Sequence, residues 1–194
     1  MNAQQKPPKK YRKATYQDVI DAPPNKVAEL IDGTLYVQSR PAMPFALAKS
    51  ALSAMLVTRF GKNYGSPGGW RIIYEPELHF GEDVLVPDIT GWRRERMPEI
   101  PDVVGVTLPP DWVCEVLSSS THKLDLGSKR DIYAREGVPW LWLTDLKART
   151  LEALELRDGE WVSLATLTDN ATVSLPPFEA IKFSLGDLWS DLKA

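Results

Sequence analysis

Two charged side chains stand inside apolar patterns of this sequence, where a charge is costly unless it has a partner. Glu115 lies within an almost unbroken apolar run, Trp112 to Leu117, which has the length and composition of a buried strand. An ionised carboxylate in such a strand costs several kcal/mol unless a cation, a hydrogen-bond network or a metal ion compensates it. We therefore expect Glu115 to have a charged partner.

Lys129 is the second of these charges. Residues 121–136 are predicted to form a helix, because capping residues open the segment and Gly137 follows it. Lys129 lies three residues before Ile132 and four before Tyr133, which places its stem on the inward face of that helix. A buried carboxylate followed by an inward lysine favours one constellation, since each charge offsets the burial of the other.

Asp88 adds a second carboxylate to this pair. It follows Val86-Pro87 within a segment, Val84 to Trp92, that is predicted to be a strand. Carboxylates from neighbouring strands can share a hard divalent cation, because Mg²⁺ is typically held by one or two carboxylates and keeps several waters. A nearby lysine can position an attacking water or stabilise charge on a phosphate. Asp88, Glu115 and Lys129 together therefore suggest phosphodiester cleavage.

Each of these residues also has an ordinary interpretation when it is taken alone. An aspartate after a proline is often a turn residue, and a helical lysine often lays its stem along the surface. His79, in a predicted strand, and His122, in a predicted loop, fit structural or bystander roles better than catalysis. Trp92, beside three arginines, is the aromatic residue that we expect to be best placed for nucleic-acid contact.

Composition limits the class of protein. The chain has 194 residues, 43% of them hydrophobic, and a net charge of -3, which argues against a protein that coats nucleic acid through bulk positive charge. The single cysteine, Cys114, lies in the apolar run, so no disulfide framework is expected. No segment is long and apolar enough to span a membrane and no apolar signal region is present, so we expect a soluble cytoplasmic protein.

The predicted elements form one mixed sheet with helices packed on it, a fold of α/β or α+β type. Residues 1–13 are expected to be a flexible basic tail and residues 14–194 a single domain. Asp32-Gly33 and Asp158-Gly159 predict an N-terminal and a C-terminal hairpin. The other predicted elements are a helix over 45–60, strands over 70–74, 77–80, 112–117 and 139–144, an edge strand within 172–183 and a closing helix over 185–192.

Several stretches of the chain resemble a known family. Pro87-Asp88 followed by Glu115-Val116-Leu117 resembles the PD-(D/E)XK nuclease superfamily, which has the restriction-endonuclease-like fold. More closely, ELIDGTLY at 29–36, VPDI at 86–89 and the stretch at 115–145, with EVLSSST and DLGSKRDIYAREGVPWLWLTD, resemble the Uma family of restriction endonucleases. This resemblance covers roughly residues 15–161.

The resemblance implies a role for each matching position. Asp88 and Glu115 would bind the metal, with the main-chain carbonyl of Val116 as a further ligand. The superfamily lysine would stand where this chain has Leu117, and in the Uma-like variant it has moved to the following helix, where Lys129 matches. Glu29 would be an acidic residue close to the metal. The implied cofactor is Mg²⁺, with Mn²⁺ as a substitute, the substrate is DNA and the assembly is a homodimer.

Two positions depart from the family pattern. The family commonly has a histidine shortly after the proline that begins the long helix, but none follows Pro44 here, and Ser118-Ser119-Ser120 replaces the usual Ser-Pro-Ser. These changes concern DNA handling or loop shape. Two hypotheses from different classes therefore stand: a Mg²⁺-dependent DNA endonuclease, and a non-catalytic nucleic-acid-binding or assembly module that keeps the fold.

Overall fold

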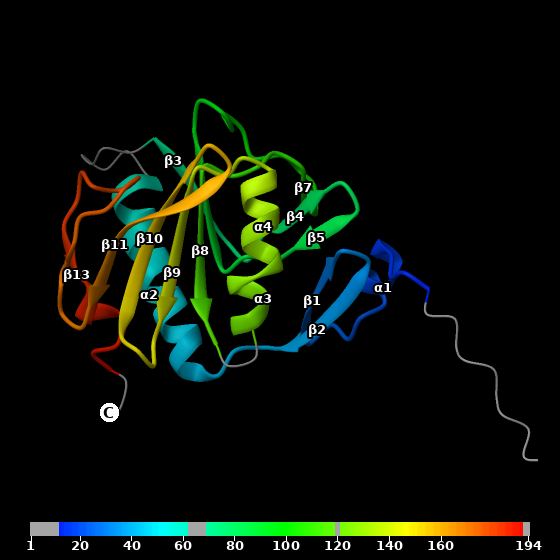
Figure 1. Cartoon of the computed structure of the whole chain (residues 1–194), viewed down its shortest axis with the longest axis horizontal. Coiled ribbons are helices and arrows are strands. Elements are labelled where there is room, and N and C mark those ends of the chain that lie inside the picture. The colour runs from blue at the N-terminus through cyan, green and yellow to red at the C-terminus, as the bar shows by residue number, and fades with distance from the viewer. Residues whose placement is uncertain (1–11, 62–68, 119–120, 192–194) are drawn as a thin grey trace, which may run out of the picture.

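A computed structural model of the chain describes residues 12–61, 69–118 and 121–191 (Figure 1). Most of the predicted flexible tail, residues 1–13, lies outside these described ranges. Its last two residues are included: the Arg12 guanidinium pairs with the Asp18 carboxylate, and the Lys13 side chain lies over Gly33 at the first hairpin turn.

A six-stranded sheet forms the centre of the molecule, with the strand order β11-β10-β9-β8-β6-β3. β8 pairs with β9 in parallel and with β6 in antiparallel orientation, so the sheet is mixed as predicted. Its strands are β3 (Trp70–Tyr74), β6 (Ile89–Arg93), β8 (Trp112–Leu117), β9 (Trp140–Asp145), β10 (Thr150–Arg157) and β11 (Glu160–Thr168).

A second sheet of five strands lies beside the first, with the order β2-β1-β5-β4-β7 (Figure 1). Its strands are β1 (Lys26–Ile31), β2 (Thr34–Ser39), β4 (Glu77–Phe80), β5 (Asp83–Leu85) and β7 (Gly105–Val106). The predicted edge strand within 172–183 is instead a separate two-stranded ladder of β12 (Thr172–Val173) and β13 (Phe183–Ser184). Both predicted hairpins, β1–β2 and β10–β11, are confirmed.

The helices are α1 (Tyr16–Ile20), α2 (Met43–Leu56), α3 (His122–Leu126) and α4 (Ser128–Arg135), with a π-helical turn over Val57–Gly61 and a 3-10 turn over Leu185–Leu188. α2 lies where the long helix was predicted. No helix within the described ranges is long and apolar enough to cross a membrane.

Alternate residues of β8 divide the core between the two faces of the central sheet. Trp112, Cys114 and Val116 pack with the α2 residues and the C-terminal segment on one face. Val113 and Leu117 pack on the other face with α4 and with residues from the five-stranded sheet. Because side chains alternate along a strand, Glu115 points to the α4 face.

The predicted strand Val84 to Trp92 is wrong as one element, because it divides into β5 and β6, which belong to different sheets. The break falls where backbone N–H groups donate to side chains instead of to a neighbouring strand. The Val86 N–H donates to the Glu29 side chain, the Asp88 N–H donates to the Glu115 side chain, and Pro87 has no N–H to donate. Carboxylates from two other strands therefore fix the passage from one sheet to the other.

The predicted single helix over 121–136 is also wrong, because Gly127 separates α3 from α4. Gly127 has φ -112° and ψ -111°, which is outside the helical region, and a Cβ there would lie 2.8 Å from the Lys123 carbonyl oxygen. The break turns α4 so that Lys129, Ile132 and Tyr133 are buried. The inward position predicted for Lys129 is thus reached by α4 alone.

Candidate active site

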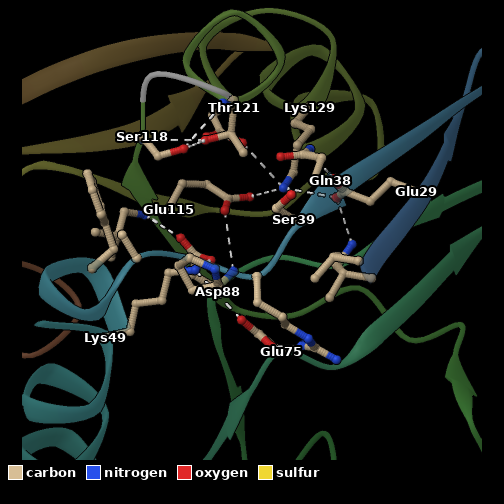
Figure 2. A pocket seen from close by; sticks show the side chains of 18 residues that line it. Glu29, Gln38, Ser39, Lys49, Glu75, Asp88, Glu115, Ser118, Thr121 and Lys129 are labelled. Atoms are coloured by element: carbon tan, nitrogen blue, oxygen red, sulfur yellow. Dashed lines mark hydrogen bonds and ion pairs between the residues drawn. The ribbon is translucent and has the colours of Figure 1, made fainter. Parts of the chain in front are cut away.

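A pocket of about 190 Å³ opens where the segment between β5 and β6 passes the end of β8 (Figure 2). Side chains from both sheets, from α2 and from the α3–α4 pair line it. Among its lining residues are all five positions that were predicted to form a site: Glu29, Asp88, Glu115, Val116 and Lys129. The fold therefore brings them together from distant parts of the chain.

Glu115 is paired on the α4 side of the pocket. Glu115 is only 1% exposed. Its Oε1 accepts hydrogen bonds from the Lys129 ammonium at 2.8 Å and from the Tyr133 hydroxyl at 2.6 Å. The strand therefore tolerates this acid because two donors on α4, one of them cationic, reach it. Its second oxygen, Oε2, accepts the Asp88 N–H at 3.3 Å.

Lys129 neutralises more than one acid. Its Nζ lies 3.1 Å from Glu29 Oε1 and 3.4 Å from Asp125 Oδ1, in addition to Glu115. All four residues are at most 2% exposed. Burial alone would lower the pKa of Lys129, but the charges of Glu115 and Glu29 outweigh it and raise that pKa well above its usual value. Lys129 is therefore a permanent cation.

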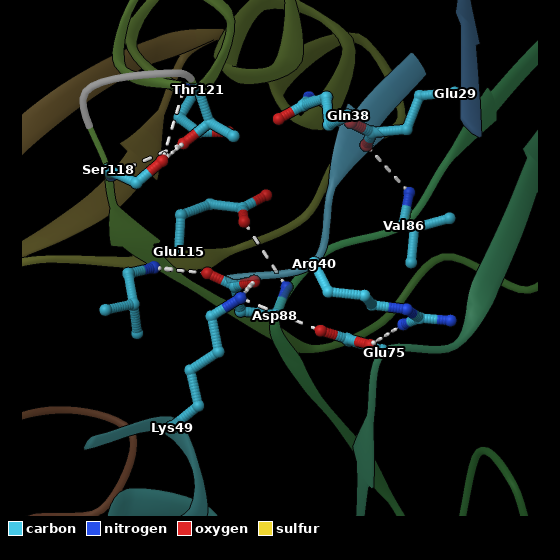
Figure 3. A network of polar contacts seen from close by, with 12 residues as sticks. Glu29, Gln38, Arg40, Lys49, Glu75, Val86, Asp88, Glu115, Ser118 and Thr121 are labelled. Carbon is cyan, nitrogen blue, oxygen red and sulfur yellow. Dashed lines mark hydrogen bonds and ion pairs between the residues drawn. The ribbon is translucent and has the colours of Figure 1, made fainter. Parts of the chain in front are cut away.

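Asp88 is held from the other direction. Its Oδ2 accepts the Val116 N–H at 2.6 Å, and its Oδ1 pairs with the Lys49 ammonium (Figure 3). The Lys49 Nζ also lies 3.7 Å from Glu75 Oε1, and Glu75 Oε2 accepts a 2.9 Å hydrogen bond from Arg40. A chain of alternating charges thus runs from Asp88 out to the exposed Arg40 side chain.

The two central carboxyls are both hard to ionise. Burial, followed by the charge of Glu115, raises the pKa of Asp88 to about 6. Burial also raises the pKa of Glu115, even though Lys129 opposes the shift. Acids with perturbed pKa values gathered in one pocket are typical of functional sites, where burial and like charges shift the pKa.

The charge balance of the pocket fits a divalent cation. Its described lining holds five acidic side chains (Glu29, Glu75, Asp88, Glu115 and Asp125) and three cationic side chains (Arg40, Lys49 and Lys129), which gives a formal charge of -2 when all of them are ionised. Among the described residues, no three His, Cys, Asp or Glu side chains are grouped closely enough to hold a metal together. A set of ligands made of two carboxylates, one main-chain oxygen and waters suits Mg²⁺.

Comparison with known proteins identifies the family. The family model Uma2, described as "Putative restriction endonuclease", matches residues 14–186. The chain belongs to the Uma2 family. Among curated proteins, no match to this Uma2 chain is found.

A solved structure shares the Uma2 chain's fold. The crystal structure of "a putative nuclease belonging to DUF820" from Anabaena variabilis superposes with a TM-score of 0.73 and 20% sequence identity, covering 91% of this chain and 97% of that one. At this identity the likeness concerns the fold. The expected restriction-endonuclease-like α+β architecture is therefore confirmed, as is the family resemblance.

Sequence reasoning missed four charged residues of this Uma2 site: Arg40, Lys49, Glu75 and Asp125. Lys49 was recoverable, because it lies three and seven residues before Leu52 and Leu56, on the face of α2 that packs inward. In the sequence, Asp125 counts only among the capping residue types near the start of the predicted helix, whereas the structure buries it four residues before Lys129. Glu75, at the end of β3, gave no pattern signal.

The expectation that Trp92 contacts nucleic acid is wrong. Trp92 is 0% exposed, and its indole N–H donates to the Leu108 carbonyl at 2.9 Å. The arginines that follow it are also engaged: the Arg93 guanidinium lies over the Trp70 ring, and Arg96 pairs with Asp111. Alternation along β6 turns Trp92 into the core on one face of the sheet and the neighbouring Arg93, which is exposed, to the other face.

The Tyr133 hydroxyl should contribute measurably to stability because its acceptor is a buried carboxylate. We expect Tyr133→Phe to lower the free energy of unfolding by about 1.5–3 kcal/mol, the range for hydrogen bonds to charged groups. Tyr16→Phe is a matched control, since it removes a 2.7 Å hydroxyl bond to Glu77 at a half-buried position and should cost less. Urea unfolding measures both values. Equal losses would show that burial of Glu115 does not strengthen its bond.

Proposed function

We propose that this protein is a Mg²⁺-dependent endonuclease that hydrolyses phosphodiester bonds in DNA. The observation that carries the proposal is the meeting of Asp88 and Glu115 in one pocket whose described lining has a formal charge of -2. Membership of a family described as restriction endonucleases supports the reaction class. Bound between these carboxylates, Mg²⁺ would supply Lewis acidity and a water of lowered pKa.

Some residues of the site would bind the cation, and others position the residues that bind it. Asp88 and Glu115, with the Val116 carbonyl, would hold Mg²⁺, as the order of the two acids along the chain implies. Lys129 opposes the protonation of Glu115 and fixes its position, and its ammonium would orient a water or stabilise negative charge on a phosphate. Glu29 holds both Lys129 and the Val86 N–H, so it positions the site.

The negative charge of the pocket also sets an order of binding. A phosphate that approaches five carboxylates and three cations meets net repulsion, and a divalent cation removes it. The protein should therefore bind duplex DNA weakly in EDTA and more tightly in Ca²⁺, an ion of the same charge that generally supports binding without rapid cleavage. Fluorescence anisotropy with a labelled duplex measures this. Equal affinity under both conditions would contradict the charge argument.

DNA cleavage tests the proposal directly. Supercoiled plasmid, linear duplex and single-stranded RNA would each be incubated with the protein in Mg²⁺, Mn²⁺ or EDTA. We expect cleavage of DNA in either metal and none in EDTA, with Glu115→Gln inactive although its circular dichroism is unchanged. If wild type cuts nothing, or if Glu115→Gln cuts as fast as wild type, the protein is a non-catalytic relative or the activity is a contaminant.

Divalent-ion binding should weaken at acidic pH. Because burial raises the pKa of Asp88 to about 6 and also raises that of Glu115, protons compete with the metal for both carboxyls. Below pH 6 we expect the dissociation constant for Mn²⁺ to rise by about tenfold per pH unit for each proton displaced, and above pH 8 to be constant. Calorimetry in buffers of different ionisation enthalpy counts the released protons. An affinity that is constant from pH 5 to 8 would contradict this.

A further inference from the structure

We propose that Lys49 is an internal counter-cation that competes with the divalent metal for Asp88, and that Glu75 receives the Lys49 ammonium when the metal binds. The inference rests on the proposed function, because it takes Asp88 as a metal ligand. It assigns roles to two residues that neither the sequence pattern nor the family resemblance singled out. Its basis is the position of one buried lysine between two carboxylates.

Lys49 is a charged residue on the buried, apolar face of α2, where a charge is not expected. It is 6% exposed on α2, among the buried residues Ala48, Leu52 and Leu56. A lysine on the apolar face of a helix is costly unless its charge is used. Its ammonium turns into the pocket and pairs with Asp88 Oδ1, while Asp88 Oδ2 accepts a hydrogen bond from the Val116 N–H (Figure 3).

The two lysines of the pocket differ in how firmly they are held. Lys129 lies within 3.4 Å of three carboxylates from three elements, so its position is fixed whatever occupies Asp88. Lys49 has two acidic partners at unequal distances: it is in contact with Asp88 and lies 3.7 Å from Glu75 Oε1. A small movement therefore exchanges one partner for the other without leaving the ammonium unpaired.

Glu75 is built to be the second partner. It has a φ of 43°, a left-handed conformation that is unfavourable for a residue with a side chain, at the point where the chain leaves β3 for β4 in the other sheet. Its N–H donates to the Asp88 carbonyl at 3.1 Å, which keeps it beside the site. Arg40, 56% exposed, holds Glu75 Oε2 and leaves Oε1 facing Lys49.

These contacts predict what happens when a divalent ion reaches Asp88. An ammonium in contact with the same carboxylate repels the ion and occupies one of the oxygens that the ion needs. Lys49 must give up Asp88, and Glu75 compensates its charge after the exchange. Lys49 thus keeps Asp88 paired before the metal arrives and weakens metal affinity as a consequence.

Metal affinity separates this role from a structural one. Mn²⁺ binding would be measured by calorimetry at pH 8.5, where Asp88 is ionised, on wild type, Lys49→Met, Lys49→Arg, Glu75→Gln and Lys123→Met. Lys123 is exposed on α3, so its change alters net charge equally without touching the pocket. We expect Lys49→Met to bind Mn²⁺ about tenfold more tightly or better, Lys49→Arg to resemble wild type, and Glu75→Gln to bind severalfold more weakly. Lys123→Met should be unchanged.

The outcomes separate this inference from the proposed function. If wild type binds Mn²⁺ and cleaves DNA but Lys49→Met binds no more tightly, the competition is overturned and the nuclease stands. A Lys49→Met protein that loses Mn²⁺ binding would overturn it in the same way, since Lys49 would then support the metal. If no variant binds Mn²⁺, both proposals fail. Tighter binding by Lys49→Met and by Lys49→Arg alike would assign the effect to packing and overturn the role of charge.

Discussion

Asp88→Asn should abolish DNA cleavage while leaving the fold intact. The amide keeps an oxygen that can accept the Val116 N–H, and Lys49 keeps Glu75 as a partner. The change removes the negative charge that would hold a divalent cation. The bound cation would contribute several kcal/mol of transition-state stabilisation. We expect the cleavage rate to fall by a factor of about 10³ or more.

The stability of Asp88→Asn separates lost chemistry from lost structure. Because burial makes the ionised form of Asp88 costly, replacing it by a neutral amide should leave the free energy of unfolding within about 1 kcal/mol of wild type. Urea unfolding and a plasmid-nicking time course on the same preparation give both values. An Asp88→Asn protein that unfolds like wild type and also cleaves like wild type would remove Asp88 from the site.

Lys129→Met should cause the largest loss of stability of any single change in the pocket. It removes the cation shared by Glu29, Glu115 and Asp125, and leaves three buried acids without their compensating charge. Removing one partner of a buried ion pair typically costs about 3–5 kcal/mol. Lys123→Met, the same substitution at an exposed position of α3, should change stability by no more than about 0.5 kcal/mol.

The loss in Lys129→Met should depend on pH in a defined direction. Burial raises the pKa values of Glu115 and Asp125, and without Lys129 they rise further, so these acids accept protons more readily in the folded protein than in the unfolded one. Protonation neutralises them as pH falls, so the difference from wild type should be smaller at pH 5 than at pH 8. A deficit that is equal at both pH values would mean that the loss arises from packing.

The core of the site was predictable because a charge inside an apolar pattern is visible in sequence. Glu115 is the one charged residue in a strand whose remaining five residues are all apolar, and Lys129 lies on the inward face of its helix. Their partnership followed from the cost of burial, and the structure places them 2.8 Å apart. Lys49 carried the same signal on α2, but a helical lysine commonly lies at the surface, and this one was not recognised as buried.

The features that were missed depend on contacts between distant segments. No local pattern shows that the N–H groups of Val86 and Asp88 will donate hydrogen bonds to the Glu29 and Glu115 carboxylates. These bonds divide the predicted strand between two sheets. The left-handed conformation of Glu75 likewise follows from the switch between sheets. Both are tertiary effects that override local propensity.

The same contacts couple the fold to the site. The backbone segment that delivers Asp88 is held by Glu29 and Glu115, and these acids are held by Lys129 from α4. Preorganisation of this kind would keep Asp88 in place for the proposed metal before it binds. It also explains why changes at Lys129 should affect stability while changes at Asp88 should affect chemistry.

Anomalous diffraction from crystals soaked in Mn²⁺ tests the central claim most directly. The account predicts one strong peak within direct bonding distance of carboxylate oxygens from both Asp88 and Glu115, with the Lys49 ammonium moved from Asp88 to Glu75. A map without a peak in this pocket, or with Mn²⁺ bound only at other surface carboxylates, would contradict it.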